Sequence, residues 1–157
     1  MNSKYIKKNN LWQLIIIEDS DALPGKSVFD LLKVLMKQFK FKYVILNDIE
    51  GAAEAANDLK EKEGEIISID EFLEKVVDVI QFDWGDFFLF LDYPKNWEFV
   101  DRSYSKQIEQ TDMTVRAIDD QYLYIYTPSQ DVLGLLKEYY TIESLKSDLL
   151  ENLDFPY

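Results

Sequence analysis

The 157-residue chain contains no cysteine and no histidine. Disulfide frameworks, thiolate zinc sites, cysteine nucleophiles and histidine general bases are therefore excluded as the basis of its fold or its chemistry. Glycine and proline are scarce as well, with 5 and 4 residues, and no Pro/Gly/Ser-rich stretch marks a boundary between domains. We therefore expect one domain that spans residues 1–157.

Basic residues are few: 17 Lys and Arg face 30 Asp and Glu, a formal net charge of −13. Residues 1–50 hold 8 basic and 6 acidic side chains, whereas residues 51–157 hold 9 and 24. Nucleic acid and anionic membranes both require a basic face, so we expect neither as a partner. The first apolar run leads directly into acidic residues, without a signal-peptide cleavage pattern. We expect a cytoplasmic protein.

Apolar residues make up 47% of the chain and aromatic residues 15%, which is enough for a substantial core. Residues 11–17 form a continuous apolar run rich in β-branched side chains, which is typical of a strand buried on both faces. Pro24, Gly25 and Ser27 predict a turn with Ser27 as the N-cap of a helix, and residues 28–39 have helical apolar spacing. A second buried strand at 43–46 follows, and this β-α-β order favours a parallel strand pair.

The rest of the chain continues to alternate helices and strands. Ser68 and Glu71 form a capping-box pattern before a helix, and Asp119 and Asp120 separate two alternating segments as in a hairpin. The further expected elements are an exposed helix at 52–63, an edge strand at 66–67, strands at 87–91, 113–118 and 122–127, and helices at 130–140 and 142–153. The fold class is therefore α/β: a central mixed sheet of about five strands, flanked by helices.

Acidic and aromatic residues concentrate around the 87–91 strand and at the hairpin. These residues form the predicted partner-binding face: Asp83, Trp84, Asp86, Asp92, Tyr93, Trp97, Asp119, Asp120 and Tyr122. Large aromatic side chains provide binding contacts, and carboxylates attract a basic partner. The alternative is structural: the tryptophans lie in the core and the aspartates form turns. Tyr122, Tyr124 and Tyr126 share one strand face, which is either an exposed contact stripe or the cover for a helix.

No calcium-binding loop, glycine-rich phosphate loop or recognisable nucleophile motif is present in the sequence. Proximity among 30 acidic residues is expected by chance, so paired carboxylates alone do not indicate catalysis. We therefore predict no cofactor, no metal site and no enzymatic activity.

Residues 14–19, 88–94 and 125–127 resemble three strands of response-regulator receiver domains. The resemblance implies that Glu18 and Asp19 hold a magnesium ion, that Asp92 accepts a phosphoryl group and that Thr127 is the switch residue. The chain departs from that pattern, because 73 residues separate Asp19 from Asp92 and no Lys-Pro follows Thr127.

In size, acidity and mixed architecture the chain resembles bacterial immunity proteins, the inhibitors of polymorphic toxins such as those of contact-dependent growth inhibition. The resemblance implies stoichiometric neutralisation of a cognate toxin domain. A nuclease toxin has a basic cleft for phosphates, which an acidic partner fills and blocks. This is the function we predict. A receiver-like phosphoacceptor domain and an adaptor with a non-toxin protein partner remain as alternatives.

Overall fold

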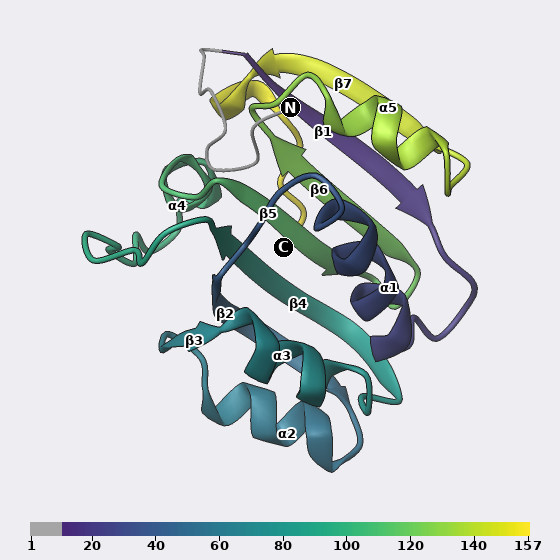
Figure 1. Cartoon of the computed structure of the whole chain (residues 1–157), viewed down its shortest axis with the longest axis vertical. Coiled ribbons are helices and arrows are strands. Elements are labelled where there is room, and N and C mark those ends of the chain that lie inside the picture. The colour runs from purple at the N-terminus through teal and green to yellow at the C-terminus, as the bar shows by residue number, and fades with distance from the viewer. Residues whose placement is uncertain (1–10) are drawn as a thin grey trace.

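A seven-stranded antiparallel sheet forms the centre of the protein in the computed structural model, which describes residues 11–157 (Figure 1). The strands are β1 (Leu11–Glu18), β2 (Tyr43–Ala52), β3 (Ile66–Ser68), β4 (Gln81–Phe90), β5 (Met113–Ile118), β6 (Tyr122–Thr127) and β7 (Ser144–Leu149), in the order β3-β2-β4-β5-β6-β1-β7. The α/β class is confirmed, but the sheet has seven strands rather than about five, and it is entirely antiparallel rather than mixed.

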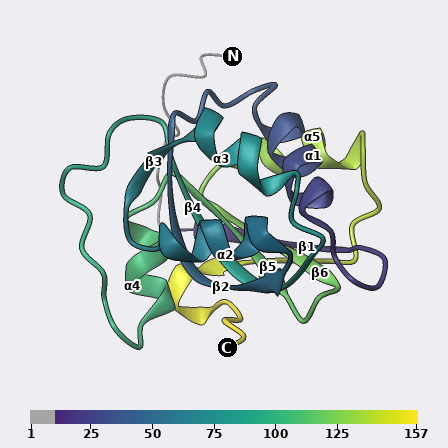
Figure 2. The ribbon, with the colours of Figure 1, turned by 90° about the horizontal axis from the view of Figure 1, so that it is seen from below.

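Helices cover the two faces of this sheet unequally. On one face pack α1 (Gly25–Leu35), α2 (Glu54–Glu61), α3 (Ile69–Val76) and α5 (Val132–Lys137). On the other face, called here the second face, lie α4 (Tyr104–Glu109) and the C-terminal segment with the 3-10 turn Leu150–Asn152 (Figure 2). The sheet therefore has a large core under four helices and a smaller one under α4 and the C-terminal segment.

Strand β1 shows why its apolar run is continuous. Ile15 and Ile17 are buried in the core beneath the four helices, whereas Trp12 and Leu14 are buried in the core of the second face. Both faces of the strand are covered, as the run of apolar residues predicts.

The predicted parallel pair of strands is not formed. β1 and β2 run in the same direction, but β6, β5 and β4 lie between them, and β1 pairs antiparallel with β6 and β7. The connection from β1 through α1 to β2 therefore crosses three strands, and the C-terminal half of the chain supplies the strands that pair with β1. Such partners lie more than 100 residues away, beyond the reach of a local pattern.

The expected helix at 142–153 is wrong: residues 144–149 form the edge strand β7, followed by the 3-10 turn. Leu145 and Leu149 are four residues apart, which suits a helix, but both lie on one face of the strand. The free edge of β1 pairs with this segment along six residue pairs, and these backbone hydrogen bonds outweigh its local preference.

Several local predictions are confirmed. Ser68 caps α3 by accepting a hydrogen bond from the backbone N–H of Glu71 at 3.1 Å. The residues Asp119 and Asp120 form the β5–β6 turn, and in α2 only Ala56 and Leu59 are buried. Ser27, however, caps no helix: α1 begins at Gly25 after Pro24, and Ser27 donates its hydroxyl hydrogen bond to Asp19 instead.

The contact between α1 and α3 depends on a glycine. The backbone N–H of Gly25 donates to the Val79 carbonyl at 2.9 Å, and a Cβ at this position would lie 1.9 Å from the Val76 carbonyl oxygen. Only a residue without a side chain permits this approach.

We predict that Gly25→Ala lowers the free energy of unfolding by about 3 kcal/mol, because the start of α1 must move away from α3. Gly134→Ala is the matched control: a Cβ in this exposed position of α5 meets nothing within 4 Å. It should raise the free energy of unfolding by about 0.5–1 kcal/mol. Urea denaturation followed by circular dichroism measures both, and equal stability of the two variants would contradict the described α1–α3 contact.

Candidate functional site

Three segments that are distant in sequence meet at one end of the sheet and bring six carboxylates together. Glu18 lies opposite Tyr122 in the β1–β6 pair, and the backbone N–H of Asp19 donates to the Gln121 carbonyl at 2.7 Å. The backbone N–H of Asp120 donates to the Asp83 carbonyl at 3.2 Å. We call this surface the acidic end; its carboxylates are Glu18, Asp19, Asp21, Asp83, Asp119 and Asp120.

The charge of the acidic end is not neutralised locally. Within residues 11–157, none of its six carboxylates takes part in an ion pair. Their side-chain partners are neutral: Gln81 donates to Asp83 at 2.7 Å and to Asp120 at 3.5 Å, and Ser27 donates to Asp19 at 2.9 Å. Neutral donors fix the geometry and leave the negative potential in place.

The turn at the acidic end holds two aspartates with left-handed backbone conformations. Asp119 and Asp120 have φ values of 51° and 49°, and the Gln121 N–H donates to the Ile118 carbonyl at 3.2 Å, which defines a two-residue type I′ turn. Asn-Gly is the preferred sequence for this turn because both positions need positive φ. The turn therefore places two carboxylates side by side, where Asn-Gly would supply no charge.

An aromatic surface adjoins the acidic end on the second face of the sheet. Trp84 on β4 and the tyrosines Tyr122 and Tyr124 on β6 are half-buried there, and β5 lies between these two strands. The ring centroids of Tyr122 and Tyr124 are 6.4 Å apart. Partial burial and the nearby carboxylates of Asp154 and Asp119 raise the pKa of Tyr124, so its hydroxyl stays protonated at neutral pH.

Beneath this surface lies a buried ion pair. Arg116 of β5 donates to Asp86 of β4 at 2.8 Å, and neither side chain is more than 1% exposed. The guanidinium carbon lies 4.1 Å from the ring centroid of Tyr104 and 5.2 Å from that of Trp84. Burial raises the pKa of Asp86 to about 6 against the opposing attraction of Arg116. Burial alone would lower the pKa of Arg116, but the adjacent carboxylate raises it.

The C-terminal segment closes over the ion pair. Arg116 also donates to the Pro156 carbonyl at 2.6 Å, and the Tyr126 hydroxyl donates to the Asp154 carbonyl at 2.6 Å. Phe155 stacks on Tyr126 with a centroid distance of 5.4 Å and an interplanar angle of 8°. The charged core of the second face is thus assembled from β4, β5, β6, α4 and the C-terminal segment.

The structure divides the sequence-predicted binding face. Asp83, Asp119, Asp120 and Tyr122 lie together at the acidic end, and Trp84 lies in the adjoining aromatic surface. Asp86 is buried in the ion pair and does not face a partner. Asp92 and Tyr93 are exposed just beyond the opposite end of β4, and Trp97 packs on Phe88 and Phe90 in the core of the second face.

The arrangement that the receiver resemblance implies is not present. Glu18 and Asp19 lie at the C-terminal end of β1, whereas Asp92 follows β4, which runs in the opposite direction. Asp92 is therefore at the far end of the sheet from the acidic pair, and Thr127 is fully buried. Within residues 11–157 no group of three or more acidic side chains is positioned to hold a metal ion.

Tyr104 and Arg116 are not among the residues that the sequence pattern predicts for the site. One feature of the sequence does point to the ion pair. Arg116 lies between Val115 and Ala117 in an apolar strand, and a buried guanidinium requires partners. Its carboxylate partner is 30 residues away, and nothing local identifies it.

Comparisons with known proteins identify no relative. The chain matches no protein-family model, and no curated protein or solved structure shows significant similarity to it. Among the helices of residues 11–157, none has the length and apolar character needed to cross a membrane. Any functional inference therefore has to come from the surfaces of this molecule.

We predict that Arg116→Met costs about 3–5 kcal/mol of stability at pH 8, because it leaves Asp86 buried without its cation. Loss of Arg116 raises the pKa of Asp86 further above its unfolded value, so the native variant binds a proton more tightly than the unfolded chain does. The variant therefore gains stability as the pH falls from 8 to 5, and the cost of the substitution shrinks.

The control is the double variant Arg116→Met, Asp86→Leu, which removes both charges and should recover most of the lost stability. Denaturant titrations at several pH values measure both effects. A pH-independent cost, or a double variant as unstable as the single one, would show that the ion pair does not organise this core.

Proposed function

We propose that this protein binds and neutralises a cognate basic toxin domain, in the manner of a bacterial immunity protein. The observation that carries the proposal is the acidic end, where six carboxylates from three segments converge without an ion pair inside residues 11–157. A surface of this kind attracts a positively charged protein and repels nucleic acid and anionic membranes.

A nuclease domain is the partner that fits this surface best. Its cleft must be basic because it holds phosphates, and carboxylates at the end of a rigid sheet occupy the same positive potential. Occupation of the cleft excludes the substrate, so inhibition is stoichiometric and needs no chemistry by this protein. The complex forms in the cytoplasm, where a nuclease toxin meets its target.

The aromatic surface supplies the second part of the interaction. Trp84 on β4 and the tyrosines Tyr122 and Tyr124 on β6 are half-buried on either side of β5 and present large rigid areas beside the acidic end. Charge accelerates encounter, whereas desolvated aromatic contacts slow dissociation. An adaptor with a non-toxin partner would use the same surfaces, and it differs in forming a complex that inhibits no activity.

The direct experiment mixes the purified protein with the product of the neighbouring gene and follows complex formation and nuclease activity. A one-to-one, salt-sensitive complex with loss of nuclease activity is the expected result. A complex that leaves the activity intact favours the adaptor, and the absence of any complex with a basic toxin domain overturns the proposal.

The acidic end is tested by the triple variant Asp83→Asn, Asp119→Asn, Asp120→Gly. It removes three charges and gives the turn its preferred Asn-Gly sequence, so the fold should be at least as stable as in the parent. We predict association with the toxin domain about tenfold slower at about 0.01 M salt and unchanged at about 1 M, where screening is complete within a few ångströms. Stopped-flow fluorescence measures the rates.

The control for this variant is Glu61→Gln, Glu65→Gln, Glu74→Gln, which removes three exposed carboxylates on the side of α2 and α3. Its net charge matches that of the triple variant, so total charge cannot explain a difference between them. If both variants slow association equally, the acidic end is not the binding surface.

The aromatic surface is tested separately by Tyr124→Ala. We predict a dissociation rate about 10- to 100-fold higher with little change in the association rate, because contact area rather than charge is lost. Tyr139→Ala removes an equally large, 49% exposed ring from the helix side and should leave both rates unchanged. Surface plasmon resonance measures the two rates for the complex of each variant with the toxin domain. An unchanged dissociation rate for Tyr124→Ala would show that the toxin domain does not contact the aromatic surface at this residue.

A further inference from the structure

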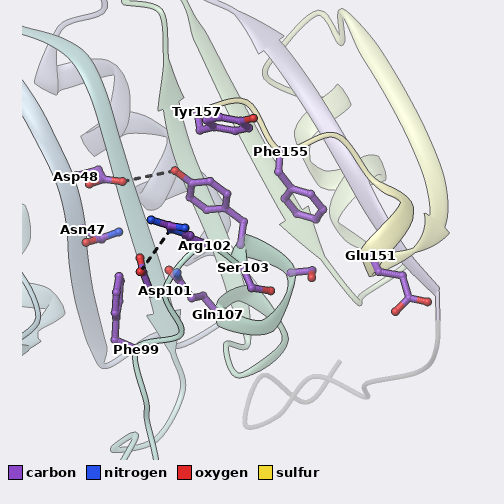
Figure 3. Close-up of a pocket in the computed structure, with 12 residues that line it drawn as sticks. Asn47, Asp48, Phe99, Asp101, Arg102, Ser103, Gln107, Glu151, Phe155 and Tyr157 are labelled. Carbon is purple, nitrogen blue, oxygen red and sulfur yellow. Dashed lines mark hydrogen bonds and ion pairs between the residues drawn. The ribbon is translucent and has the colours of Figure 1, made fainter.

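A cavity with a volume of about 800 Å³ opens on the second face of the sheet, apart from the acidic end (Figure 3). Its wall combines Asp48 of β2, Phe99 and Arg102 of the loop before α4, and Phe155 and Tyr157 of the C-terminal segment. This volume is in the range of small-molecule sites. None of the six carboxylates of the acidic end lines the cavity.

Gln107 of α4 contributes an unused hydrogen-bond acceptor to the wall. Its side-chain amide donates to the Val100 carbonyl at 2.6 Å, and its backbone N–H donates to the Ser103 carbonyl at 3.1 Å. The residue is only 3% exposed, and its Oε1 atom has no partner among residues 11–157. The bond to Val100 holds the side-chain amide and the bond to Ser103 holds the backbone, so Oε1 is a fixed acceptor that a donor from a ligand in the cavity would satisfy.

Asp48 adds an exposed carboxylate to the cavity wall, and this carboxylate forms no ion pair with another residue of 11–157. It has a φ of 50° and lies where the β2–β4 pairing shifts register, between Asn47 and Glu50. Its carboxylate accepts one long hydrogen bond, 3.5 Å from the Tyr104 hydroxyl, as Figure 3 shows. Of the charged side chains around the cavity, Arg102 is the single cation, and it pairs with Asp101 at 3.8 Å.

Aromatic rings complete the wall. Tyr104 and Phe155 lie nearly parallel, with an interplanar angle of 9° and a centroid distance of 6.4 Å. The Arg116 guanidinium lies 4.1 Å from the Tyr104 centroid and occupies that face of the ring, so a ligand would contact the other ring surfaces of the wall. Phe99 is 57% exposed at the rim of the cavity.

We propose that this cavity binds an organic cation, a guanidinium or ammonium group carried on a short aliphatic chain. The cation donates hydrogen bonds to Gln107 Oε1 and to the Asp48 carboxylate, and its charge and stem pack against the rings. The excess of carboxylates over Arg102 disfavours an anion. The inference does not depend on the toxin partner, because the cation is either a free amine or a basic side chain of a bound protein.

The test titrates the full chain, ¹⁵N-labelled, with N-acetylarginine methylamide, with agmatine and with the uncharged N-acetylcitrulline methylamide. We expect saturable shifts of the Gln107 side-chain amide with a dissociation constant of about 1 mM, and binding at least about tenfold weaker for the citrulline compound. Tighter binding of agmatine identifies a free amine as the source, whereas equal or tighter binding of the capped arginine identifies a protein side chain. Equal binding of the citrulline compound, or no saturable shift, overturns the proposal.

Variants locate the site. Asp48→Asn and Phe99→Ala should each weaken binding of the arginine compound about 3- to 10-fold, because one removes the charge and the other an exposed ring face. The control is Asp83→Asn, Asp119→Asn, Asp120→Gly, which should leave this affinity unchanged. If that control weakens binding and the cavity variants do not, the cation binds at the acidic end and the cavity is not its site. Failure of toxin binding leaves these measurements unaffected.

Discussion

The buried guanidinium of Arg116 is the constraint on which the second face of this protein depends. Arginine does not lose its proton, so a position in the middle of β5 commits the surrounding chain to a carboxylate, further acceptors and aromatic cover. Asp86 supplies the charge, Pro156 a carbonyl, and Tyr104 and Trp84 the rings. These contacts explain how a helix of only six residues and a short C-terminal segment can form a layer, although they offer little apolar area.

The same constraint also leaves part of the second face open. Because α4 and the C-terminal segment converge on Arg116, they leave Tyr122 and Tyr124 half-exposed toward the acidic end. Trp84 belongs to both the aromatic cover of Arg116 and the aromatic surface, since its ring faces the guanidinium and remains partly accessible to solvent. Aromatic groups held on paired strands lose little freedom on binding, which is the condition for an anchor that slows dissociation.

The sequence predicts the elements that depend on neighbouring residues. It does not predict the elements that depend on partners distant in the chain. The β1 run, the Ser68 cap and the Asp119–Asp120 turn depend on local residues, and all three were recognised. Local spacing predicts a helix where β7 lies, because Leu145 and Leu149 suit a helix as well as a strand. Pairing with the open edge of β1 makes the segment a strand. The ion pair was missed for the same reason, since its two members lie on strands joined by more than twenty residues.

Strand direction also explains why the candidate site differs from the predicted one. Asp83 and Asp92 are close in sequence, but the part of β4 from Asp83 to Phe90 that lies between them extends for about 23 Å. Antiparallel pairing instead joins the start of β4 to the end of β1 and to the β5–β6 turn, so carboxylates from remote segments share one edge. Aspartate is common in type I′ turns, so the backbone accommodates Asp119 and Asp120, although Asn-Gly would adopt the same positive φ angles without repulsion between two charges. The two adjacent carboxylates therefore add negative potential to this end of the sheet, at the cost of repulsion between them.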